Sequence, residues 1–243
     1  PAVTAAVGDG ATLTAGRDIE VASLHNRLAD ASPGDGLARA RAESSAGALV
    51  GVTGASADAT AAAATETLIG AAELTAESGN IAIRSLTSNR ADAEADGAIV
   101  GIAGIGTSFA DATVDSQTRT RVGFGAALTA QQDVIATAQA IDDGGALAIA
   151  GSGGVISGAG ADANASVTPI VETLIGTGGA PAPLTVTAGE DVRIAALSEA
   201  HAIADATGTT IGVGTIGFSD ADTSLNATVA AVIHPAASVN AGD

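Results

Sequence analysis

The phrase that decides the fold reads Leu13-Thr14-Ala15-Gly16-Arg17-Asp18-Ile19-Glu20-Val21. Variants of it start at Leu74, Leu128 and Val186, and a further copy begins at Val239. The anchors are spaced by 61, 54, 58 and 53 residues. Self-similarity at such a period is typical of repeat architectures, in which each unit buries its apolar face against the next one.

The repeat predicts four units, at 13–73, 74–127, 128–185 and 186–238. A second marker precedes several anchors, as in Leu68-Ile69-Gly70-Ala71 and Leu174-Ile175-Gly176. Residues 1–10 read as the close of a unit and Val239–Asp243 as the opening of another. We therefore expect both ends to be cut within a longer array, and neighbouring repeats to be the main partners of this segment.

Within each unit the apolar pattern has a period of two. Between Ala110 and Val122 small or apolar residues alternate with polar and charged ones, and the run around Ala93 does the same. Half-buried strands require this pattern. Ala, Glu and Arg individually favour helix, but a helix over residues 37–68 would scatter its charges around every face. The sequence therefore predicts an all-β fold, a parallel β-solenoid.

The composition predicts a thin core of Ala, Gly, Val and Ile. Apolar residues make up 47% of the 243 residues, yet only three are aromatic, and 32 are Gly. The Gly-rich stretches 47–54, 97–106, 151–160 and 208–217 are interpreted as tight corners and as strands pressed against the opposite sheet. The Pro-containing insert 178–183 is interpreted as a loop that leaves the coil.

The length of one coil has two interpretations. Ala38 to Ala57, Ala93 to Ala112 and Ala202 to Ala221 are each 19 residues apart. This spacing favours coils of about 19 residues, three to a unit, which would form a rod of about a dozen rungs. The alternative is one wide coil of about 55 residues per unit.

Charge excludes some partners. The net charge is −18, with 27 acidic residues, nine Arg and no Lys. Such a chain has little with which to neutralise the phosphates of nucleic acid or of an anionic membrane. No run reaches the roughly 18 apolar residues of a membrane helix, so we expect no membrane insertion. There is no Cys for disulfide or thiolate chemistry.

The repeated phrase resembles the β-helical repeats of filamentous haemagglutinin-like adhesins and large autotransporters. The longer unit, with its Ala-x-Ala run and Ala-Asp-Ala-Thr segment, resembles repeats of very large Gly/Ala-rich bacterial surface proteins. The resemblance spans essentially the whole chain. It implies an extracellular location at the bacterial cell surface and an adhesive or structural role, with self-assembly into fibres as a further possibility. It implies no catalytic residue, and it does not identify the adhesive ligand.

The sequence assigns no catalytic, cofactor-binding or metal-binding residue. His25, His201 and His234 have no metal-site spacing and read as surface or turn residues. One alternative is a calcium-binding stalk, because Asp58, Asp111, Asp162 and Asp222 sit at about one place in each unit and Ca²⁺ prefers oxygen ligands. Another is a β-helical polysaccharide-active enzyme, for which the sequence offers few acid–base candidates.

Overall fold

The computed structural model describes residues 1–28, 32–179 and 182–242, and in these it is all-β, without a helix. Residues 180–181 of the expected loop and Asp243 of the last repeat phrase lie outside the described residues. The strands are β1 (Ala2–Val7), β2 (Thr12–Ala15), β3 (Ile19–His25), β4 (Ala38–Ile69), β5 (Glu73–Ala76), β6 (Ile81–Gly123), β7 (Ala127–Ala130), β8 (Val134–Gly153), β9 (Ile156–Val167), β10 (Ile170–Thr177), β11 (Leu184–Ala188), β12 (Val192–Ile211), β13 (Gly214–Leu225), β14 (Thr228–Ile233) and β15 (Ala237–Asn240).

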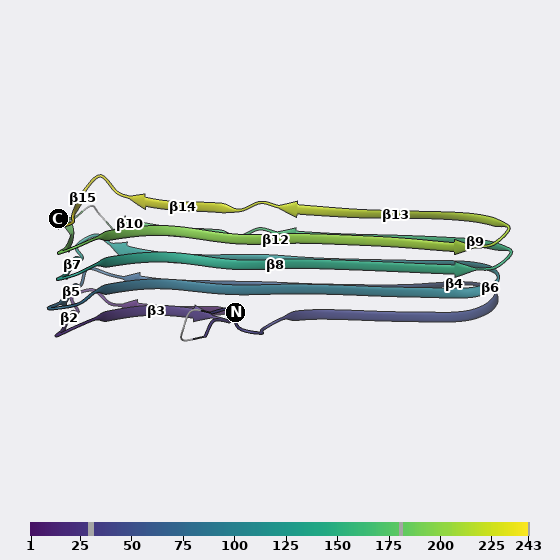
Figure 1. Ribbon diagram of the computed structural model, residues 1–243, viewed down its shortest axis with the longest axis horizontal. Coiled ribbons are helices and arrows are strands. Elements are labelled where there is room, and N and C mark those ends of the chain that lie inside the picture. Colours follow the sequence, from purple (N-terminus) through teal and green to yellow (C-terminus); the bar gives the residue numbers. More distant parts are fainter. Residues whose placement is uncertain (29–31, 180–181, 243) are drawn as a thin grey trace.

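The strands form long parallel sheets, an arrangement that is compatible with a β-solenoid. A five-stranded sheet contains the short strands in the order β15-β11-β7-β5-β2, and a ten-stranded sheet contains the long ones. Figure 1 shows the long strands stacked side by side, with the short strands gathered at one end. The longest dimension of the molecule follows the strands and not the direction of stacking.

The strand register contradicts the expected coil of about 19 residues. Ala38 of β4 pairs with Ala91 of β6, 53 positions later, and Ala103 of β6 pairs with Ile156 of β9 at the same offset. The offset is 62 between β3 and β6 and 58 between β8 and β12. The predicted anchors pair with one another, since Leu74 pairs with both Leu13 and Leu128. Each pass of the chain is therefore about as long as a whole unit.

We call one such pass a layer. Each layer begins with a short strand, continues into an outgoing strand, turns, and comes back as a return strand. In the second layer these parts are β5, residues 81–100 of β6 and residues 103–123 of β6; in the third they are β7, β8, and β9 with β10. We call the turn at the far end of the layers the tip, comprising residues 48–54, 101–107, 154–160 and 212–218.

The core between the two long faces changes composition along the strands. Beside the short sheet it is an Ile, Leu and Val cluster that includes Ile69, Ile81 and Leu128. Towards the tip it becomes a cluster of alanines that includes Ala112 and Ala163. Both alanines are fully buried while Asp111 beside them is exposed, so the predicted alternation is confirmed. The buried hydroxyls between the two clusters belong to Ser23, Thr65, Thr67, Ser85, Thr87, Ser116, Thr118, Thr120 and Thr173.

One threonine in each of three layers joins the two faces of the core. Thr67, Thr120 and Thr173 occupy the same position on successive return strands. Their hydroxyls donate to the backbone carbonyls of Arg84, Thr137 and Ala195, at 2.7, 2.8 and 2.7 Å. Each acceptor lies on the outgoing strand of the following layer. These bonds tie each layer to the next one across the core and satisfy buried polar groups that would otherwise be costly.

Candidate interaction surface

The three histidines lie apart from one another. His25 is on β3, where burial lowers its pKa, and His201 is on β12, with Nε2 3.5 Å from Glu199. His234 follows β14, and its ring contacts Phe124 edge-on at a centroid distance of 4.9 Å. Among the residues that the structure describes, no group of three or more His, Asp or Glu side chains could hold a metal ion.

The predicted aspartate column is wrong at one position. Asp58 pairs with Asp111, but Asp111 pairs with Asn164, which in turn pairs with Asp222. Asp162 lies two residues away and pairs with Phe109. A shift of two residues keeps every side chain on the same face, so alternation alone could not detect it. Asn164 Nδ2 donates to Asp111 Oδ1 at 3.1 Å and to Asp162 Oδ1 at 2.9 Å, so an amide bridges these carboxylates.

A different aspartate in the repeat phrase has a structural role that the sequence analysis missed. Asp18, Asn80, Asp133 and Asp191 follow one another in register at the corner before each outgoing strand. The side-chain oxygens of the first three accept the backbone N–H of the next, at 2.8, 3.0 and 3.0 Å. The bond from Asn80 N–H lowers the pKa of Asp18. The signal was present as the recurring Asp or Asn before Ile or Val.

One carboxyl is buried inside the core. Asp142 of β8 is fully buried, and its oxygens accept hydrogen bonds from Asn89 Nδ2 and Ser116 Oγ, both at 2.8 Å. Burial raises the pKa of Asp142, while the two hydrogen bonds oppose that shift. Because protein atoms enclose both oxygens, this carboxyl belongs to the core of the fold and offers no open site.

The turn at the tip depends on a column of glycines. Gly101, Gly154 and Gly212 are successive in the stack, and a Cβ on Gly154 would lie only 2.3 Å from the carbonyl oxygen of Gly101. A Cβ on Gly212 would lie 2.2 Å from the carbonyl of Gly154. Ala48 occupies this position in the first layer, beneath Gly101. The glycines let consecutive turns approach closely, which confirms that these stretches form tight corners.

Large apolar side chains cover the outside of the tip. Val50, Val213 and Ile216 are 78%, 91% and 81% exposed. The residues directly after the glycine column are all apolar and more than half exposed, and the outward positions of the following return strands add more. Together they form what we call the tip surface: Leu49, Val50, Val52, Ile102, Ile105, Val155, Ile156, Val213, Ile216 and Phe218. Monomeric proteins rarely leave so many neighbouring apolar groups in water.

A groove crosses the return-strand side of the tip surface. It has a volume of about 820 Å³ and is walled by Val52, Ile105, Ile156, Ile216 and Phe218. Its floor contains Gly158 and Gly160, and the Phe218 ring lies over Gly160, with Cε1 2.9 Å from where a Cβ would be. Glycines in the floor and branched residues in the walls give the surface alternating hollows and projections. An occupant must therefore be mostly apolar.

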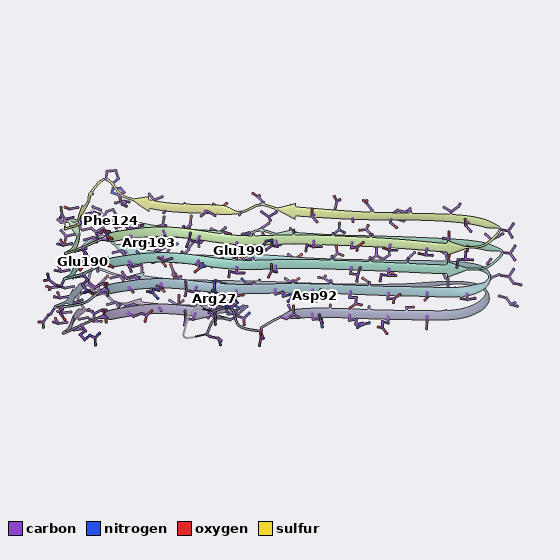
Figure 2. All side chains as sticks on the ribbon, in the orientation of Figure 1. Arg27, Asp92, Phe124, Glu190, Arg193 and Glu199 are labelled. Carbon is purple, nitrogen blue, oxygen red and sulfur yellow. The ribbon has the colours of Figure 1, made fainter. Side chains whose placement is uncertain are left out.

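No charged residue belongs to this surface, and Asp220, two residues after Phe218, is the charged residue nearest to it along the chain. Residues 44–57, 97–110, 144–161 and 206–219 contain no Asp, Glu, Arg or Lys. The charged residues nearest to the tip are all acidic, on outgoing and return strands alike: Glu43, Asp58, Asp96, Asp111, Asp143, Asp162, Asp205 and Asp220. None of the charged side chains labelled in Figure 2 lies at the tip. The molecule thus combines an acidic body with an uncharged apolar tip.

The sequence indicated the corner but not this surface. Its glycines predicted the turn, whereas the exposed Val and Ile residues read as core. The missing charges over residues 97–110 were the available signal. Over the described part of the chain, no helix is long and apolar enough to span a membrane. Comparison with known proteins adds no relative: no family model, no curated protein and no solved structure matches this chain.

Proposed function

We propose that this chain is a structural or adhesive segment of a long, secreted bacterial surface protein, and that its stacked layers form a β-solenoid. The observation that carries the proposal is the register. Residues of β4 pair with β6 without slipping from Ile69 back to Val50, and the offset of 53 recurs between β6 and β8. A chain that stacks this regularly is suited to extension by addition of further layers.

The use of polar side chains supports a structural role. The buried threonine hydroxyls and the corner Asp and Asn residues bond from one layer to another. Ion pairs on the outer faces do the same, since Arg39 contacts Asp92 at 2.7 Å and Arg119 contacts Glu172 at 2.8 Å. Pairs of this kind contribute little individually, but these also join one layer to the next.

Location is tested on cells of the source bacterium. Antibodies raised against the 243-residue chain should label intact cells. Labelling that appears only after the cells are permeabilised would contradict surface display. Cells whose outer surface has been treated with protease serve as the control and should lose the signal.

The structural role is tested by adding layers. In a chain in which residues 74–185 are duplicated, the anchor at Leu74 follows residue 185 in the way that Val186 now does. We expect two further layers, a stack about 10 Å taller in electron micrographs, and a higher free energy of unfolding, because the new layers bury their edges against neighbours. A duplicated chain that is no more stable than the original would contradict a stacking array.

A further inference from the structure

We propose that the tip surface pairs with the tip surface of a second copy of this chain, so that two stacks associate side by side. This inference goes beyond the proposed function, which concerns growth along the stack. Growth along the stack uses the strand edges of the first and last layers, whereas the tip surface lies on the side of every layer. It is built from Leu49, Ile102, Val155 and Val213 at the turn and from the return strands next to it.

The exposed area fits an interface. Fully burying one aliphatic side chain removes roughly 60–120 Å² of apolar surface from water. The ten side chains of the tip surface, each at least half exposed, therefore present on the order of 400–800 Å². This reaches or exceeds the largest apolar patch of an ordinary monomer and approaches what one partner contributes to a stable complex.

The shape of the groove fits a copy of itself. Rotation by 180° about the stacking direction places two return-strand faces against each other, with strands antiparallel and equivalent layers side by side. Such a two-fold contact requires one surface to carry both projections and hollows. This rotation keeps each layer at its own height. Within the third layer, Ile156 of one copy supplies a projection that can face Gly158 and Gly160 of the other copy. Facing sheets pack about 10 Å apart when such side chains interdigitate.

The distribution of charge makes the tip the part of the surface where two copies repel each other least. With a net charge of −18, copies repel each other over most of their surface. When only the tips overlap, the acidic rim of one copy lies beside the uncharged turn of the other. In three layers the nearest carboxylate on this face is six positions further along the strand, as Asp58 is from Val52; this is about 20 Å, more than twice the screening length at physiological salt. Only in the fourth layer is it closer, because Asp220 follows Phe218 by two positions. The acidic rim also disfavours an anionic membrane as the occupant.

The same geometry repeats in every layer. Because the two-fold axis is parallel to the stack, each added layer brings its own tip into the contact. Linked contacts of this kind strengthen one another, since the second forms at a high effective concentration. Two long arrays should therefore associate far more tightly than two copies of this chain.

The test measures the oligomeric state of the intact chain by sedimentation equilibrium over a range of concentrations. We expect a monomer–dimer equilibrium, which Ile105→Glu weakens about tenfold or more because a charge then enters the apolar contact. Ile156→Thr, which keeps a β-branched side chain, is a milder second variant. Ile149→Glu is the matched control: Ile149 also lies in an inner layer and is 36% exposed, against 50% for Ile105, but it is on the outgoing strand.

Salt and lipid distinguish the other occupants. Added NaCl should strengthen the dimer by screening the acidic rims, whereas it would weaken binding of a basic partner. A chain that stays monomeric at every concentration overturns the inference, as does a dimer that Ile105→Glu leaves intact. Binding to phosphatidylcholine vesicles that is lost in Ile105→Glu, without dimerisation, would assign the tip to lipid instead. Association through the stack ends would give open oligomers that resist Ile105→Glu, so failure here leaves the proposed function standing.

Discussion

At the scale of the residue, a buried threonine hydroxyl links the two strand faces across the core. Thr120 is fully buried at the middle of the core, where its hydroxyl donates to the carbonyl oxygen of Thr137 at 2.8 Å and lies 2.9 Å from Ser85 Oγ. Removing one partner from such a buried network leaves the other group without its bond, which costs more than the bond itself contributes.

Thr120→Val tests this role because it keeps the shape of the side chain. We expect the free energy of unfolding to fall by about 1–3 kcal/mol, the penalty for polar groups left unpaired in the core. Urea denaturation provides the measurement. Thr113→Val is the control, since Thr113 lies on the outer face of the same strand. Equal stability of the two variants would show that the hydroxyl is dispensable.

The contribution of Asp142 to stability becomes more favourable as the pH falls, the opposite of the usual behaviour of a carboxyl group in a folded protein. Burial raises the pKa of Asp142 in the folded chain above the ordinary value of an aspartate, so the folded state holds this proton at pH values where the unfolded state has lost it. This group therefore costs stability near neutral pH, and that cost disappears as the pH falls through the folded pKa. We expect Asp142→Asn to raise the melting temperature at neutral pH and to lose this advantage towards about pH 4.

The control for that experiment is Asp115→Asn, which removes the same charge from an exposed position on a return strand. It accounts for the general benefit of lowering the net charge of an acidic chain. If both variants shift the melting temperature equally at every pH, the burial of Asp142 has no effect on stability.

At the scale of the element, the tip turn depends on how closely two backbones can approach. Gly154→Ala would place a methyl group 2.3 Å from the carbonyl oxygen of Gly101, and backbone cannot move aside as a flexible side chain can. We expect a loss of about 1–3 kcal/mol or more in the free energy of unfolding. At neighbouring Gly153, an added Cβ would lie 3.9 Å from Val100 Cγ2, an ordinary contact. Gly153→Ala should therefore be neutral or slightly stabilising, and chemical denaturation compares the two.

The long strands also show where sequence reasoning succeeded and where it could not. The alternation predicted which side of each strand is buried, because the period of two is a local property. The 19-residue spacing of Ala93 and Ala112 led to a wrong prediction of the coil length. Gly97 faces Ser108 across the core. Four residues further from the tip on each of the two strands, Ala93 lies opposite Ala112. The spacing thus measures a turn back within one layer, and a sequence repeat cannot distinguish a turn back from a full coil.

The apolar tip was hidden for a different reason. Val52 and Ile105 alternate with their neighbours as core residues do, and only the pairing of return strands shows that they point outward. Hydrophobicity predicts burial in the finished assembly and not in an isolated chain, so a surface that needs a partner reads as interior. The absence of charge over the same residues was the one independent sign.

At the scale of the whole molecule, stability should differ between layers. Residues 81–100 of β6 pair with β8 on one side and with β3 and β4 on the other, whereas β13 pairs only with β9 and all its residues are exposed. We expect hydrogen exchange measured by mass spectrometry to be slowest in β6 and β8 and fastest in β13 and β14, because edge layers open without breaking the rest. Uniform protection would indicate that the layers unfold only together.

The flat, wide layer has a mechanical consequence. Tension along the stack pulls across the strands, so the hydrogen bonds between two layers are loaded one after another from a corner and not all at once. A layer adds only about 4.8 Å to the height of the stack. When peeled away, its 53 residues extend to about 180 Å. A tether made of such layers yields at modest force, lengthens almost fortyfold at each step, and can fold back into register when the load is released.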